Sequence, residues 1–189
     1  MRRMRQSCLA DAVIETERLV LRNWRDEDRA PFAAMSADGE VMRHLNGPTD
    51  RAASDALIDR LRGEAQAGYT FWAIERRADG ALLGFCGLRR GGHAGTPVVD
   101  VLEIGWRLRR DAWGQGYARE AAQASLAWGW VHCPDSEIYA WTVAANTGSW
   151  GLMKRLGMRH RPECDFDHPV FTGDHPLSRH IVYSIGRPA

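Results

Sequence analysis

The stretch Trp113-Gly114-Gln115-Gly116-Tyr117-Ala118 joins two segments of different periodicity. Residues 98–108 before it form an apolar run rich in β-branched and aliphatic side chains, which predicts a strand. Residues 119–130 after it place small and apolar side chains on one face at helical spacing. The free N–H groups and the macrodipole at the start of such a helix favour anions, and glycines let a phosphate approach the main chain. We therefore predict a diphosphate-binding loop, with an ordinary strand-to-helix turn as the alternative.

The spacing of the loop residues distinguishes three kinds of phosphate-binding loop. A P-loop ends in Gly-Lys-Ser/Thr, whereas this loop ends in Gly116-Tyr117-Ala118. The dinucleotide fingerprint needs Gly or Ala three residues after its second glycine, and Arg119 stands there. The remaining pattern, Trp113-x-x-Gly116-x-Ala118, resembles the coenzyme A loop of the GCN5-related N-acetyltransferases (GNAT family), Gln/Arg-x-x-Gly-x-Gly/Ala. Trp at its first position is common in the branch that resembles the ribosomal-protein N-terminal (RimJ/RimL-type) acetyltransferases.

The order of elements along the chain resembles the same family from about Thr16 onward. Asp79-Gly80 predicts a hairpin between two of the expected strands. We expect strands at 16–22, 69–75, 82–88, 98–108, 138–143 and 180–185, and helices at 26–37, 41–47, 50–67, 119–130 and 149–156. The resemblance implies a mixed α/β (α+β) fold with a central, mostly antiparallel twisted sheet of about seven strands flanked by helices. Residues 1–14 are expected to form a leader, and residues 15–189 one acetyltransferase domain.

Composition limits the class of protein. The chain has 189 residues and a net charge of +1, so one domain without a strongly basic face is expected, and direct nucleic-acid binding is disfavoured. No apolar segment resembles a secretory signal or a membrane span. The widely spaced cysteines predict free thiols and a cytoplasmic protein: Cys8, Cys86, Cys133 and Cys164.

The resemblance implies transfer of an acetyl group from acetyl-CoA to a primary amine, either a protein N-terminal α-amine or a small molecule such as a polyamine or an aminoglycoside. The amine must be neutral to attack, so a carboxylate whose pKa is raised by burial would serve as the general base. Glu103 is the candidate for this base, and pairing with an arginine is its alternative role. Many relatives use a Tyr where this chain has Met153, which leaves the hydroxyl of Ser149 to interact with the departing thiolate, with a second capping hydroxyl as its alternative role.

The resemblance also implies which residues bind acetyl-CoA. The pantetheine arm would lie along the main chain of a strand, and the diphosphate would lie on the loop and the helix start. Asn146 would reach the pantetheine, with an N-cap as its simpler role, and Lys154 with Arg155 would reach the 3′-phosphate, with a solvated helix face as the alternative. The expected cosubstrate contacts are Trp106, Arg107, Leu108, Trp113, Gly114, Gln115, Gly116, Tyr117, Ala118, Arg119, Asn146 and Lys154.

A group of acidic residues and histidines near the C-terminus matches no standard zinc spacing, so no metal is expected: Asp165, Asp167, His168, His175 and His180. The expected partner is the amine acceptor, without membrane or nucleic-acid binding, and a homodimer is a candidate assembly. A protein that binds acyl-CoA as a regulator, without turnover, is the alternative from another functional class.

Overall fold

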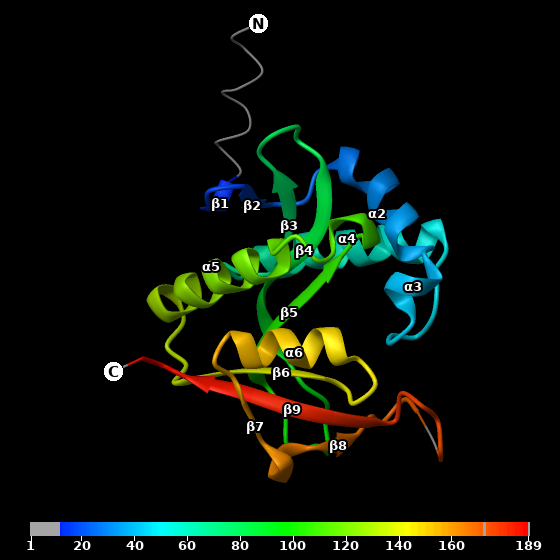
Figure 1. Ribbon diagram of the computed structural model, residues 1–189, viewed down its shortest axis with the longest axis vertical. Coiled ribbons are helices and arrows are strands. Elements are labelled where there is room, and N and C mark those ends of the chain that lie inside the picture. Colours follow the sequence, from blue (N-terminus) through cyan, green and yellow to red (C-terminus); the bar gives the residue numbers. More distant parts are fainter. Residues whose placement is uncertain (1–11, 172, 189) are drawn as a thin grey trace, which may run out of the picture.

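The computed structural model describes residues 12–171 and 173–188 (Figure 1). Its centre is a mixed sheet in which the order of strands is β1-β2-β3-β4-β5-β6-β9-β7, with β8 paired to β9. All described strand pairs are antiparallel except β5 with β6. The strands are β1 (Ala12–Glu15), β2 (Leu19–Arg22), β3 (Phe71–Arg76), β4 (Leu82–Gly91), β5 (Val101–Leu108), β6 (Glu137–Val143), β7 (Arg159–His160), β8 (Phe166–Asp167) and β9 (Arg179–Gly186).

Side-chain caps mark the start of some of the described helices. Asp38 and Asp50 accept hydrogen bonds from main-chain N–H groups of the first turns that follow, and Gly157, with φ of +85°, lies just beyond the last helix. The helical segments are η1 (Asp26–Asp28), α2 (Arg29–Ser36), α3 (Gly39–Met42), α4 (Arg51–Ala65), η2 (Arg110–Ala112), α5 (Tyr117–His132), α6 (Thr147–Arg155) and η3 (Pro162–Cys164). The mixed α/β architecture with a mostly antiparallel sheet is therefore confirmed.

The N-terminal region differs from its prediction. Of the strand expected at 16–22, only Leu19–Arg22 is a strand (β2), and it pairs with β1 before it. Residues 16–18 form the turn between them, in which the N–H of Thr16 donates to the carbonyl oxygen of Leu19 and the N–H of Leu19 donates to the Thr16 hydroxyl. Strand β1 thus begins at Ala12, inside the segment assigned to a leader, while residues 1–11 lie outside the described residues. Strands β7 and β8 were not predicted, since two residues each are too few to show a period.

Two hydrophobic cores cover the two faces of the sheet. Helix α5 packs on one face, where the small side chains of Ala121 and Ala122 let it approach the strands closely, and α6 extends this core. Helices α2, α3 and α4 cover the other face around Phe32, Phe71 and Phe85. We refer to these as the α5 face and the α4 face of the sheet. No described helix is long and apolar enough to cross a membrane.

The sheet opens between β5 and β6. Strands β4 and β5 pair continuously from Gly84–Leu108 to Gly91–Val101, but β5 and β6 pair only where Glu103 lies opposite Tyr139. Beyond that point residues 104–108 of β5 and 140–143 of β6 run on without pairing, although both strands continue. We call these two unpaired stretches the fork.

Candidate active site

The loop before α5 has the backbone conformation that its glycines predict. Gly114 has a φ of +72° and Gly116 a φ of +83°, a region that residues with a Cβ rarely adopt. Gly116 is the N-cap of α5 and provides no side chain to bind the first N–H groups. A Cβ at position 114 would meet no atom within 4 Å, so the main chain there is open to an approaching group.

The N–H groups at the start of α5 have no acceptor among the described residues. The first bond into the helix runs from the N–H of Glu120 to the carbonyl oxygen of Gly116, at 3.0 Å. The N–H groups of Tyr117, Ala118 and Arg119 precede it and donate to no described group. Free N–H groups, the positive end of the helix and close access at Gly114 together fit the diphosphate of coenzyme A.

Arg18, from the turn between β1 and β2, holds this loop in place. Its Nη1 donates to the carbonyl oxygen of Gln115 at 3.0 Å, its Nη2 pairs with the Glu120 carboxylate at 2.6 Å, and its guanidinium lies 4.6 Å from the centre of the Tyr117 ring. Sequence reasoning gave Arg18 no role. The sequence feature that could have indicated this contact is Glu120, an acidic residue in the first turn of α5 that can pair with a cation.

Along β5, the main-chain N–H and C=O groups of every second residue face the fork. The N–H of Arg109 bonds to the carbonyl oxygen of Leu83 on β4, so by the antiparallel alternation residues 103, 105 and 107 also bond to β4. The main-chain groups of Trp106 and Leu108 therefore face the fork, whereas those of Arg107 face β4. The Nε1 of Trp113 donates to the carbonyl oxygen of Leu108 at 2.8 Å, which links the loop to the edge of the fork.

Glu103 lies at the closed end of the fork, opposite Tyr139. Its Oε2 accepts a hydrogen bond from Nε of Arg89 at 2.9 Å, while its Oε1 makes no hydrogen bond with the described residues. The side chain is only 13% exposed, and this burial raises the pKa of the carboxyl group, against the opposing effect of Arg89. Glu103 thus forms the ion pair that was its alternative role, and it keeps one oxygen and a raised pKa suited to a general base.

The start of α6 supplies Asn146 and Ser149. The Oδ1 of Asn146 accepts a hydrogen bond from the N–H of Ser149 at 3.4 Å, and its Nδ2 donates to the Thr142 hydroxyl at 3.0 Å, so Asn146 is an N-cap. The Ser149 hydroxyl, partly exposed, makes no hydrogen bond to a described group. Met153 is buried in the core, and exposed Lys154 lies 4.5 Å from the Trp150 ring centre.

The histidines near the C-terminus lie among aromatic rings. The ring centres of His93 and His168 are 4.2 Å apart, those of His168 and His180 are 5.2 Å apart, and Phe166 stacks on His180 at 5.3 Å. Within residues 12–171 and 173–188, no group of three or more His, Cys, Asp or Glu side chains is arranged to hold a metal ion. The cysteines Cys86, Cys133 and Cys164 are free thiols, and Cys8 lies outside the described residues.

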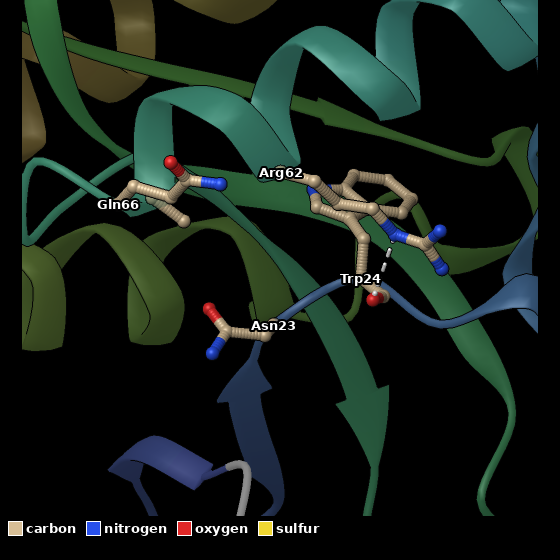
Figure 2. Close-up of a pocket in the computed structure, with 5 residues that line it drawn as sticks. Asn23, Trp24, Arg62 and Gln66 are labelled. Carbon is tan, nitrogen blue, oxygen red and sulfur yellow. Dashed lines mark hydrogen bonds between the residues drawn. The ribbon is translucent and has the colours of Figure 1, made fainter.

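A cavity of about 260 Å³ lies on the α4 face, away from the fork (Figure 2). It is lined by Asn23, Trp24, Arg62, Ala65 and Gln66. Arg62 is fully engaged there, because its Nε donates to the Trp24 carbonyl oxygen at 3.1 Å and its Nη1 pairs with Asp26 at 2.9 Å.

Comparisons with known proteins agree with this geometry. A family model described as an acetyltransferase (GNAT) domain matches residues 18–159. The N-acetyltransferase p20 of Bacillus licheniformis, itself described as uncharacterized, is 31% identical over 153 residues, 76% of this chain and 80% of that protein. A GNAT-family acetyltransferase structure from Bacillus anthracis has a TM-score of 0.76 at 23% identity, covering 92% of this chain and 98% of that one.

A further solved structure contains coenzyme A. RimL, described as a ribosomal L7/L12 alpha-N-protein acetyltransferase in complex with coenzyme A, has a TM-score of 0.74 at 15% identity, covering 93% of this chain and 98% of that one. At this identity the likeness shows a shared fold. The family model, by contrast, spans more than half of the chain, and so the chain belongs to the acetyltransferase (GNAT) family.

Proposed function

We propose that this protein transfers the acetyl group of acetyl-CoA to a primary amine, by direct attack of the amine on the thioester while both substrates are bound. The observation that carries the proposal is the fork between β5 and β6, which ends beside the uncapped start of α5. One site can there receive an extended arm with amides and a diphosphate. Membership of the acetyltransferase family and the coenzyme A bound to the RimL structure support the choice of cosubstrate.

Acetyl-CoA would be bound mainly by main-chain groups. The diphosphate would accept hydrogen bonds from the N–H groups of Tyr117, Ala118 and Arg119, and the pantetheine amides would pair with Trp106 and Leu108 along the open edge of β5. Asn146 and Lys154, both on the neighbouring α6 segment, are our candidates for the remaining polar contacts. A main-chain N–H at the fork can also donate to the thioester oxygen as negative charge develops on it.

Glu103 would act as the general base. The amine nitrogen forms a bond to the carbonyl carbon, the carbon–sulfur bond breaks, and the proton lost by the nitrogen passes to the Glu103 carboxylate, directly or through one water. Burial raises the pKa of Glu103 toward the working pH, so its carboxylate accepts a proton more readily than an ordinary Glu would. The free hydroxyl of Ser149 would donate a hydrogen bond to the departing thiolate.

The test is a free-thiol release assay with acetyl-CoA and a panel of peptides with different first residues, polyamines and aminoglycosides. We expect thiol release that depends on the amine, with a matching increase in mass of the acceptor. In a parallel thermal scan, coenzyme A should raise the melting temperature and NAD should not, because a ligand stabilises only the state that binds it. Stabilisation by NAD but not by coenzyme A would overturn the proposal, and stabilisation by coenzyme A without any turnover would indicate a binding protein.

A further inference from the structure

Arg107 is a cationic side chain in the site that has no anionic partner. It lies two residues along β5 from Gly105 and four from Glu103, so by the alternation of a strand all three are on the α4 face of the sheet. Its Nε is buried without a hydrogen-bond acceptor, and it forms no ion pair with any described residue. A partly buried charge without an anionic partner costs free energy, and a bound anion would offset part of that cost.

Other arginines of the α4 face are paired, which makes Arg107 an exception. Arg22 pairs with Asp28 at 2.7 Å, Arg62 with Asp26 at 2.9 Å, and Arg89 with Glu103 at 2.9 Å. The environment of Arg107 instead contains an aromatic ring and a second cation, Arg60, which itself pairs with Glu64 at 3.6 Å. Its guanidinium carbon lies 5.2 Å from the centre of the Phe85 ring, and burial together with the charge of Arg60 lowers its pKa to about 10.

Stacked aromatic rings lie between Arg107 and the ion pair that contains the candidate base. Phe85 stacks on Phe71 with ring centres 5.3 Å apart and an interplanar angle of 8°, and Arg89 lies on the other side, 5.2 Å from the Phe71 ring centre. The Phe71 ring fills the space above Gly105, since a Cβ there would approach it to 2.6 Å. A continuous floor of two stacked rings thus runs from the Arg89–Glu103 pair to Arg107.

The two ends of this floor differ in what they would recognise. At one end the Glu103 carboxylate can accept a proton from an amine; at the other the Arg107 guanidinium, with Arg60 nearby, attracts an anion. The Cα atoms of residues 103 and 107 are separated by about 13 Å along an extended strand, and the Phe85 and Phe71 rings lie between the guanidinium groups of Arg107 and Arg89. An acceptor whose amine reaches Glu103, directly or through one water, and whose anionic group reaches Arg107 would match this arrangement.

We propose that Arg107, assisted by Arg60, binds a carboxylate of the acceptor, so that the enzyme acts on primary amines that also carry an acidic group. This specificity rests on the proposed acetyltransferase function. The carboxylate can belong to a free amino acid or to an acidic residue at the start of a peptide, and the guanidinium pairs with either in the same bidentate way.

The test compares matched acceptors with and without the carboxylate. One arm uses free amino acids and their carboxamides, and the other uses peptides that begin with Asp or with Asn. The wild-type enzyme should favour the acid over its amide in at least one arm by about tenfold or more in kcat/KM, since charged hydrogen bonds are the strong ones. Which arm responds identifies the source of the carboxylate. No preference in either arm would overturn the proposal.

Arg107→Met should abolish this preference by raising KM for the acidic acceptor about tenfold. Its KM for the amide and the Kd of coenzyme A should stay close to wild type. Arg107→Lys should keep part of the preference, and Arg159→Met, at an exposed arginine of β7, should change nothing. If Arg107→Met instead weakens coenzyme A binding, the guanidinium binds a phosphate of coenzyme A and the proposal is wrong.

Two further readouts do not depend on turnover. Arg107→Met should fold with a melting temperature close to wild type, because loss of the cation–π contact with Phe85 is offset by removal of a charge whose Nε is buried without an acceptor. With coenzyme A present, an N-acetylated amino acid should raise the melting temperature of wild type more than its amide does, and this difference should vanish in Arg107→Met. If this difference in melting temperature is found but no amine is acetylated, the proposed transferase function is wrong and the anion site is supported. If amines are acetylated but the difference is absent, only the proposed anion site is wrong.

Discussion

In the proposed function, the donor side and the acceptor side of the fork recognise their ligands in different ways. On the donor side the available groups are main-chain N–H groups. Some lie at the start of α5, from Tyr117 onward, after a loop with two glycines, and others lie along the open edge of β5. On the α4 side the available groups are side chains, Glu103 and Arg107 on a floor of stacked phenyl rings. Main-chain groups are the same in every sequence, so the donor side suits one common cosubstrate, whereas the side chains of the acceptor side can be changed one at a time to select an amine.

The largest effect is expected on the acceptor side, from Glu103→Gln. We expect kcat to fall by about 100-fold, the size typical of losing a positioned base, with the Kd of coenzyme A nearly unchanged. Wild-type activity should decrease toward acid pH as Glu103 is protonated. Because burial raises the pKa of this group, that decrease should begin at a higher pH than an ordinary Glu would give, and the variant should lack it.

A matched control for this experiment is Glu163→Gln, which removes an exposed carboxylate that pairs with Arg161 at 2.7 Å, outside the fork. It should keep wild-type kcat and its pH profile. Unchanged turnover of Glu103→Gln across the pH range would show that Glu103 serves only to hold Arg89.

The next effect belongs to the donor side. Gly116→Val places a branched side chain at a φ of +83° and beside the diphosphate-binding N–H groups, with its Cβ 3.3 Å from Nη2 of Arg18. Losing two charged hydrogen bonds of about 1.5–3 kcal/mol each should weaken coenzyme A binding at least tenfold, as measured by titration calorimetry well below the melting temperature.

Gly95→Val provides the matched control, since Gly95 has a φ of +81° with no atom within 4 Å of an added Cβ, in the loop after β4. It should carry the same backbone strain and keep normal coenzyme A affinity. Undiminished affinity in Gly116→Val would mean that the loop is only a turn.

A smaller effect is expected from Trp113→Phe, which tests how the loop is joined to the fork. The change removes the hydrogen bond from Trp113 Nε1 to the Leu108 carbonyl oxygen while keeping an aromatic ring. One neutral hydrogen bond contributes about 0.5–1.5 kcal/mol, so coenzyme A affinity should fall by about three- to tenfold. Trp130→Phe, further along α5, should leave the affinity for coenzyme A unchanged. If both variants lose the same affinity, the hydrogen bond from Trp113 to Leu108 has no specific role in binding.

The smallest effect concerns Asn146, where capping and ligand binding can be separated. Asn146→Ala removes the cap of α6 and should cost about 1 kcal/mol of stability, or a decrease of about 2–4 °C in melting temperature for a domain of this size. Asn146→Asp keeps the capping oxygen and loses the donor that now bonds to Thr142. If the amide donor also binds the pantetheine arm, the Asp variant should melt near the wild-type temperature yet bind coenzyme A more weakly, and normal binding would leave Asn146 as a cap alone.

The sequence by itself predicted most of the elements and the backbone conformation of the loop before α5. Helices α2, α4, α5 and α6 and the hairpin at Asp79-Gly80 follow from local signals, namely apolar periodicity, capping side chains and positive-φ glycines. The diphosphate loop could be read in the same way, because its chemistry lies in consecutive main-chain groups whose conformation is a property of six neighbouring residues. The strong family resemblance rests on the same local patterns.

Tertiary structure alone decided which side chains meet. Arg18 reaches Glu120 across a separation of 102 residues, and Glu103 pairs with Arg89 because β4 and β5 place them opposite one another. That Arg107 turns its main chain to β4 and its unpaired guanidinium to the α4 face depends on register, which a sequence pattern does not specify residue by residue. Contacts between distant segments are set by strand pairing and packing, so the side chains that would select the acceptor become apparent only when the sheet is assembled.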